Sequence, residues 1–71
     1  MSAKYKSATM WAIYNARYGF YVGTQFTRHD MIQEHTTDLG KDWKYCRERG
    51  DSAVRVRITA IDDLEESKND N

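Results

Sequence analysis

Apolar and polar side chains alternate most regularly near the end of the chain, in the stretch SAVRVRITAI at residues 52–61. Every second position there is β-branched and apolar, at Val54, Val56 and Ile58, and the positions between them hold arginine and threonine. Successive side chains of a strand point to opposite faces of its sheet. The stretch therefore predicts a half-buried strand with one apolar face and one polar face.

Two earlier stretches, TMWAIYNA at 9–16 and GFYVGTQF at 19–26, are rich in residues that favour strands and predict a β-hairpin. We expect the hairpin to close through a four-residue loop at 16–19 that is built on a type I turn. Gly19 then supplies the left-handed conformation at the end of the loop.

The loop length fixes which residues of the hairpin face each other. With four residues in the loop, Asn15 pairs with Phe20 and Tyr14 pairs with Tyr21. A three-residue loop is the alternative, and it shifts the pairing by one residue. Tyr14 then moves to the face that carries Phe20 and Val22.

Two helices are predicted between the hairpin and the last strand. Thr27 is a suitable N-cap, with Asp30 three residues later where an acid favours the positive end of the helix dipole, so we expect a helix over about 28–37. Asp42 is the expected N-cap of a second, short helix, and Gly50 lies just past its end.

These elements define the predicted fold class, α+β in the order β-β-α-α-β. We expect a three-stranded, mainly antiparallel sheet with one long and one short helix on one face. The last strand can pair beside either member of the hairpin, and we prefer the first. The predicted core packs sheet residues Trp11, Ile13, Phe20, Val22, Phe26, Val54, Val56 and Ile58 against helix residues Ile32, His35, Leu39, Trp43 and Cys46.

The chain of 71 residues is long enough for one small domain, which we place at 9–61 after a flexible N-terminal segment at 1–8. The segment 62–71 holds five acidic residues, one lysine and one large apolar residue. It can bury too little apolar surface to offset its ordering entropy, so we expect a disordered acidic tail. The whole chain has a formal net charge of zero, which argues against strong non-specific DNA binding.

The composition also excludes several functional classes. A single cysteine, Cys46, cannot form an internal disulfide, and no apolar run is long enough to span a membrane. The first residues lack the apolar stretch of a secretory signal peptide. We therefore expect a cytoplasmic protein without a membrane partner.

The residues that could hold a metal are His29, Asp30, His35 and Cys46. The six-residue gap between the histidines does not place both on one face of a helix, so we expect no metal site. Cys46 lies on the inward side of the short helix, where a thiol is usually an inert small hydrophobic group. No phosphate-binding glycine loop, nucleophile motif or carboxylate pair among apolar residues is present. We expect neither a cofactor nor enzymatic activity.

The sheet face turned away from the helices is the predicted interaction surface, with Tyr14, Tyr21, Gln25, Arg55 and Arg57. Aromatic rings beside arginines are how small sheets hold single-stranded nucleic acid, and Tyr and Arg are also enriched at protein–protein hot spots. The structural alternative is that these residues simply occupy a solvated strand face, with arginine stems covering the rings.

A pattern of core and turn residues resembles small phage- and prophage-encoded proteins of unassigned function. Trp-Ala-Ile is followed by Thr-Arg, Met-Ile, Gly-x-x-Trp, Arg-Gly and Val-Arg-Val-Arg-Ile. The matching residues are Trp11, Ala12, Ile13, Thr27, Arg28, Met31, Ile32, Gly40, Trp43, Arg49, Gly50, Val54, Arg55, Val56 and Ile58. The resemblance implies an accessory protein without a catalytic site, acting in the host cytoplasm.

Three functional hypotheses follow. The first is a small non-enzymatic protein that binds a host protein and modulates it. The second is a single-stranded nucleic-acid-binding protein that uses Tyr14, Tyr21, Arg55 and Arg57. The third, a homodimer paired along an exposed strand edge, is compatible with either.

Overall fold

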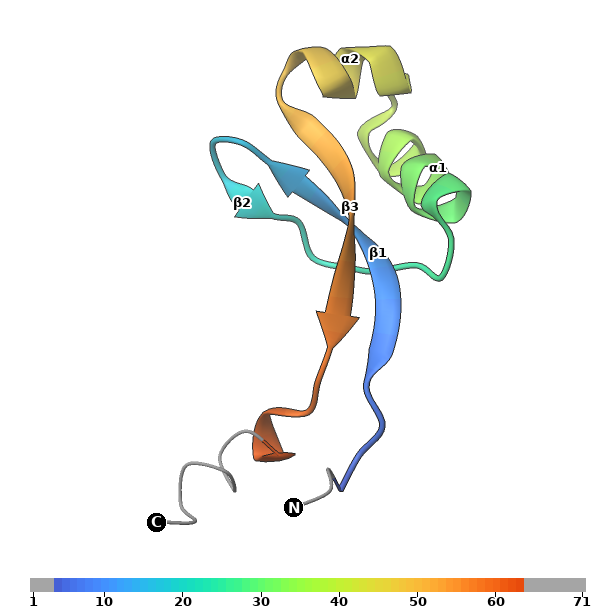
Figure 1. Ribbon diagram of the computed structural model, residues 1–71. Coiled ribbons are helices and arrows are strands. Elements are labelled where there is room, and N and C mark those ends of the chain that lie inside the picture. The colour runs from blue at the N-terminus through green and yellow to red at the C-terminus, as the bar shows by residue number, and fades with distance from the viewer. Residues whose placement is uncertain (1–3, 64–71) are drawn as a thin grey trace.

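The computed structural model describes residues 4–63. Three strands and two helices follow one another in the predicted order (Figure 1): β1 (Ala8–Asn15), β2 (Gly19–Phe20), α1 (Arg28–Leu39), α2 (Trp43–Glu48) and β3 (Asp51–Ile58). The α+β class is confirmed.

The sheet has the strand order β2-β1-β3, and both pairings are antiparallel. This confirms that the last strand lies beside the first. β1 and β3 pair along their whole length, from Ala8 opposite Ile58 to Asn15 opposite Asp51. β2 adds two residues at one end, and both helices pack on the same side of the sheet (Figure 1).

The hairpin loop is shorter than we preferred. Asn15 pairs with Gly19, so the loop consists of residues 16–18 and the three-residue alternative is the correct one. The Asn15 side chain explains the difference, because its Oδ1 accepts hydrogen bonds from the backbone N–H groups of Arg17 at 2.8 Å and Tyr18 at 3.0 Å. This contact within the turn tightens the loop by one residue.

Beyond Phe20 the second arm of the hairpin leaves the regular ladder. Pairing with β1 resumes where Trp11 bridges to Gln25, although continuing the hairpin register would have placed residue 23 opposite Trp11. The two additional residues form a bulge in which Gly23 has a φ of 111° and the Val22 side chain is fully exposed.

Both predicted helix starts are confirmed. The Thr27 side chain caps α1 by accepting a hydrogen bond from the N–H of Asp30 at 3.1 Å, and the Asp42 carboxylate caps α2 in the same way at 2.8 Å. α1 extends two residues past the predicted end, to Leu39, because Gly40 adopts the left-handed conformation that closes the helix.

The predicted core is only partly correct. Ile13, His35 and Cys46 are buried as expected, but several apolar residues assigned to the core are exposed: Phe20, Val22, Phe26, Leu39 and Ile58. Other residues are buried instead, and two of them are polar or charged: Met10, Ala12, Met31, Asn15 and Asp51. The register between β1 and β3 explains why Asn15 and Asp51 are buried together.

That register gives the sheet two unlike faces. Trp11, Ile13 and Asn15 lie on the face that packs against the helices, here called the helix-covered face, and their partners on β3 are Arg55, Ala53 and Asp51. The opposite face, here called the uncharged face, carries no charged side chain on its paired strand positions: Ala8, Met10, Ala12, Tyr14, Phe20, Ser52, Val54, Val56 and Ile58. The valines predicted to meet Trp11 and Ile13 therefore lie on the other side of the sheet.

The two ends of the described chain meet beyond the sheet. The Asp63 carboxylate accepts hydrogen bonds from the backbone N–H groups of Lys4 at 2.9 Å and Tyr5 at 3.2 Å. Residues 62–63, assigned from sequence to the acidic tail, belong to a helical turn over 61–63. The remainder of the predicted disordered tail, residues 64–71, lies outside the described residues. Within residues 4–63, no helix has the length and apolar character that crossing a membrane requires.

Candidate functional site

The structure does not bring the five predicted surface residues together on one face. Arg55 pairs with Trp11 and Arg57 with Thr9, so both arginines lie on the helix-covered side of the sheet, where they are exposed. Tyr14 lies on the uncharged face and is 39% exposed. The expected combination of Tyr14 with the two arginines is wrong, because the β1–β3 register places them on opposite sides of the sheet.

Tyr21 belongs to the helix-covered side as well. Its ring packs against the His35 ring with 4.8 Å between centroids, and its hydroxyl oxygen accepts a hydrogen bond from Arg49 Nη2 at 2.5 Å. Burial and the nearby Asp51 carboxylate raise the pKa of the Tyr21 hydroxyl. Tyr21 does lie beside an arginine, as predicted, but that arginine is Arg49.

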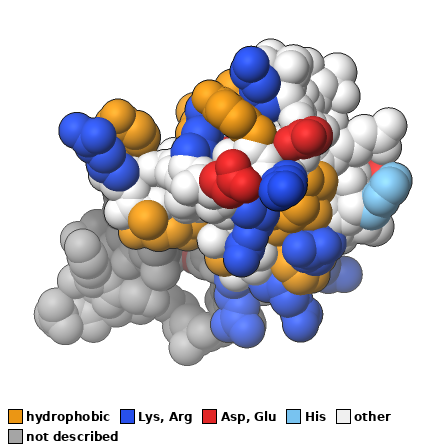
Figure 2. All heavy atoms as spheres, turned by 90° about the horizontal axis from the view of Figure 1, so that it is seen from above, with side chains coloured by type: hydrophobic (Ala, Val, Ile, Leu, Met, Phe, Trp, Pro, Cys, Tyr) orange, Lys and Arg blue, Asp and Glu red, His pale blue; other side chains and the backbone are white. Residues whose placement is uncertain are grey.

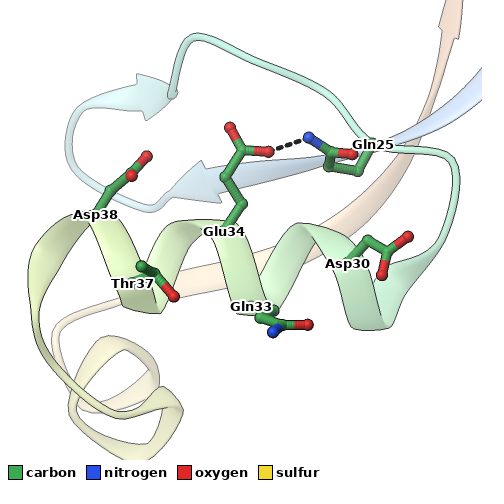
Figure 3. A pocket seen from close by; sticks show the side chains of 6 residues that line it. All are labelled: Gln25, Asp30, Gln33, Glu34, Thr37 and Asp38. Carbon is green, nitrogen blue, oxygen red and sulfur yellow. Dashed lines mark hydrogen bonds between the residues drawn. The ribbon is translucent and has the colours of Figure 1, made fainter.

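Gln25 faces α1. Its side-chain amide donates a hydrogen bond to the Glu34 carboxylate, and both residues line a hollow that also holds Asp30 and Asp38 (Figure 3). The three acids recur every four residues, so they follow one side of the helix. Gln25 thus ties the end of the bulged segment to an acidic helix surface.

A buried polar cluster lies where the helices meet the end of the sheet. The Asp51 carboxylate, 1% exposed, accepts three hydrogen bonds, from Asn15 Nδ2 at 2.7 Å, His35 Nε2 at 2.9 Å and Arg49 Nε at 3.1 Å. The His35 bond requires the proton on Nε2, because a carboxylate only accepts. Burial alone would raise the pKa of Asp51, but the three hydrogen bonds outweigh it and lower the pKa.

The cluster includes one group of side chains with metal-ligand chemistry. The ligand atoms of His35, Cys46 and Asp51 lie within 4.8 Å of one another, and all three residues are buried. However, His35 and the Arg49 guanidinium both bond to the same Asp51 oxygen, and burial raises the pKa of the Cys46 thiol and disfavours the thiolate. The arrangement is that of a satisfied hydrogen-bond network that holds α1, α2 and the sheet together.

The aromatic side chains and Ile58 of the uncharged face are exposed. Phe20 is 60% exposed and Ile58 is 44% exposed, and the Tyr14 and Phe20 rings meet edge to face with 4.9 Å between centroids. Beside them Ala12 and Val56 line a shallow apolar hollow, together with the bulged segment at 21–24. Both helices lie on the other side of the sheet, so no described helix covers this surface (Figure 1).

Sequence reasoning missed two residues on which these sites depend. Phe20 was assigned to the core, and its exposure follows only from the loop length. Asp51 was counted only as one charge of the basic region. It lies between the glycine that follows the second helix and the alternating residues of the last strand. An acid at this position can form a buried polar contact with a neighbouring strand. Its partner Asn15 ends the adjacent strand.

Comparison of the chain with family models, with curated proteins and with solved structures finds no significant match. The function must therefore be argued from the residues themselves.

Proposed function

We propose that this protein acts without enzymatic activity, by binding another protein through the uncharged face of its sheet. The observation that carries the proposal is the exposure of Phe20, Tyr14 and Ile58 on a surface without charged strand positions. A small chain must use most of its large apolar side chains in its core, so their exposure at the surface favours an interaction role. The resemblance to phage and prophage accessory proteins makes a host protein the expected partner.

The dimensions of the face indicate what it can receive. An eight-residue strand is about 27 Å long, and the face is three strands, or about 10 Å, wide only at the end where β2 adds its two residues. This area matches the apolar side of one amphipathic helix, which is about 10 Å across, or of a strand pair. A partner that contributes apolar side chains and no unpaired charge fits a face of this composition.

Pairing of two copies along β3, the long edge strand, is less favourable than use of the face. Arg55 and Arg57 both lie on β3, and an antiparallel β3–β3 pairing centred near them brings the arginines of the two copies opposite each other. Like charges directly opposite one another destabilise a strand pair, and charged edge residues are a common protection against edge association.

The test is a capture experiment from bacterial lysate, run with and without nuclease. The tagged protein is compared with Ile58→Lys and Phe20→Ser, which alter the uncharged face at exposed positions, and with Arg55→Ala, an exposed change on the other side of the sheet. We expect one protein to be recovered near stoichiometrically by the wild-type protein and Arg55→Ala, with nuclease or without it, and to be lost with both face variants.

Two results would contradict the proposal. Recovery of the same partner by Ile58→Lys and Phe20→Ser would remove the uncharged face from the interaction. Loss of all captured proteins after nuclease treatment would replace protein binding by nucleic-acid binding. Circular dichroism of each variant separates loss of binding from loss of fold.

A further inference from the structure

A separate pocket opens at the end of the sheet, between the β1–β2 loop and the chain that follows α2. It is lined by Asn15, Arg17, Tyr18, Tyr21 and Arg49. Figure 2 views the molecule from this end and shows Lys and Arg side chains next to hydrophobic ones, with acidic side chains among them. The pocket is distinct from the uncharged face and contains only one residue of the predicted nucleic-acid surface, Tyr21.

The Arg49 guanidinium is held in position before any ligand arrives. Its Nε donates to the buried Asp51 carboxylate at 3.1 Å, its Nη2 donates to the Tyr21 hydroxyl at 2.5 Å, and its Cζ lies 5.8 Å from the Tyr21 ring centroid. These bonds use two of the five N–H groups of the guanidinium, and 34% of the side chain remains exposed. An arginine fixed in this way is preorganised to bind a phosphate.

The other side of the pocket carries a second cation and an accessible ring. Tyr18 is 76% exposed, and the Arg17 guanidinium lies 5.3 Å from its ring centroid. Among residues 4–63, Arg17 has no carboxylate within 4.0 Å, so its charge is not neutralised there by an ion pair. The loop that carries both residues is held by Asn15 Oδ1, which positions the cation and the ring together.

We propose that this pocket binds one nucleotide unit, as a free nucleoside monophosphate or as part of a single strand. The base stacks on Tyr18, and the phosphate lies between Arg17 and the fixed guanidinium of Arg49. Stacking on an exposed ring tolerates any base, because every base has a flat π surface, so the site selects the nucleotide class and not a sequence.

The side-by-side arrangement of ring and cations favours a nucleotide over a phosphotyrosine. In a nucleotide a flexible sugar separates base and phosphate, so the two can bind next to each other at an open surface. In phosphotyrosine the phosphate extends the rigid axis of the ring, which requires a deep slot with the cations at its base. Tyr18 stands exposed beside Arg17, and Arg49 is itself partly exposed, so the pocket offers a shallow surface.

Two measurements test the site with the two forms of the ligand. Fluorescence anisotropy with labelled oligothymidylate tests a single strand, and amide chemical shifts with uridine monophosphate test a free nucleotide. We expect Tyr18→Ala to weaken oligonucleotide binding about tenfold through loss of stacking. Arg17→Ala should weaken it and also reduce the slope of log K against log salt by about 0.7, the value for one phosphate contact to a single strand. Tyr5→Ala and Arg28→Ala, exposed positions away from the pocket, are the matched controls and should bind as the wild type does.

Shifts at residues 15–21 and 49 with uridine monophosphate alone identify a free-nucleotide site, and shifts that require the oligonucleotide identify a single-strand site; both support the proposal. Binding of inorganic phosphate as tight as that of the nucleotide would overturn it, because the ring would then contribute nothing. Tighter binding of phosphotyrosine than of the nucleoside monophosphate would overturn it in favour of a phosphopeptide. Absence of binding by every probe, or equal loss in the control variants, would also overturn it.

Discussion

The two faces of this small sheet differ in their polar and apolar groups: the helix-covered face buries a polar cluster beside Ile13, whereas the uncharged face buries Met10 and Ala12 but exposes its aromatic side chains. On the helix-covered face an aspartate, an asparagine and a histidine are buried together, and every buried side-chain polar atom of the described residues has a hydrogen-bond partner. On the uncharged face Phe20, Tyr14 and Ile58 are exposed. The polar cluster satisfies its hydrogen bonds within the described residues and therefore stabilises the fold. The exposed apolar side chains of the uncharged face are the basis of the proposed protein-binding role.

The comparison makes opposite predictions for substitutions on the two faces. Changing a buried polar residue should cost stability even though it removes no apolar contact, because its partners lose their bonds inside the protein. Changing an exposed apolar residue should cost little stability and affect binding. Four experiments separate these outcomes, and each is a measurement on the full chain.

Asp51→Ala should have the largest effect. It leaves Asn15, His35 and the partly buried Arg49 guanidinium without their common acceptor, and breaking a buried charged network by removing one partner costs about 3–5 kcal/mol. A domain of this size has a total stability of about 4–10 kcal/mol, so we expect a largely unfolded variant. Urea unfolding followed by circular dichroism measures the loss, with Asp62→Ala, an exposed acid, as the control. A variant within 1 kcal/mol of wild type would show that the cluster does not hold the fold.

Acid should remove part of the same stabilisation. The pKa of Asp51 is lower in the folded protein than in the unfolded chain, so between the two pKa values the unfolded state binds more protons than the folded state. Stability from this group is therefore fully present above the unfolded value of about 3.9 and is lost as pH falls through the folded pKa.

Urea midpoints measured from pH 7 down to pH 2.5 test this dependence. We expect a loss that is smaller than that of Asp51→Ala, because a protonated carboxyl keeps some of its hydrogen bonds. Asp51→Asn, where it folds, should show a shallower pH dependence over the same range. An equally steep acid loss in that variant would assign the effect to other carboxylates.

Arg49→Lys tests whether the geometry of the cluster matters as well as its charge. Lysine keeps the positive charge but cannot donate to Asp51 and to the Tyr21 hydroxyl at the same time from a planar group. We expect a loss of about 1–2 kcal/mol, reduced by the partial exposure of the side chain. Arg47→Lys is the control and should be neutral, because Arg47 is exposed and its side chain makes one hydrogen bond within residues 4–63, to Ser52 at 3.4 Å. Equal stabilities would mean that charge alone suffices.

Much of this fold could be predicted because the relevant signals are local. The side chains of Thr27 and Asp42 cap the two helices, so the residue types alone predict where each helix begins. The alternation of residues 52–58 predicts a strand without information from any other segment. The order of the strands was narrowed to two arrangements, since short connections leave few open, and the preferred one is the order that the structure has.

The face assignment could not be predicted in the same way. Alternation shows which residues of one strand share a face, but not which face of a second strand they join. Grouping all apolar positions together placed Val54 and Val56 with Ile13. The structure pairs Asn15 with Asp51 instead, and that polar contact sets the register of the whole β1–β3 ladder.

The hairpin shows the same limit on a smaller scale. Loop length depends on whether the Asn15 side chain bonds back to the loop, which residue types alone do not decide. A loop shorter by one residue placed Phe20 on the face of Tyr14, whereas the β1–β3 register separated Tyr14 from Arg55 and Arg57. The five residues of the predicted binding surface therefore do not share one face, although each of them is at least partly accessible.

Phe20→Ser should have the smallest effect on stability and is the most direct test of the comparison. The ring is 60% exposed and touches Tyr14 at one edge, so its removal should cost about 1 kcal/mol or less. Ile13→Ala, at a fully buried position on the other face of the same sheet, should cost about 2–5 kcal/mol and is the matched reference. Parallel urea titrations give both values. If Phe20→Ser were as damaging as Ile13→Ala, the uncharged face would be part of the core of the free protein, and an exposed interaction surface would have to be sought elsewhere on the molecule.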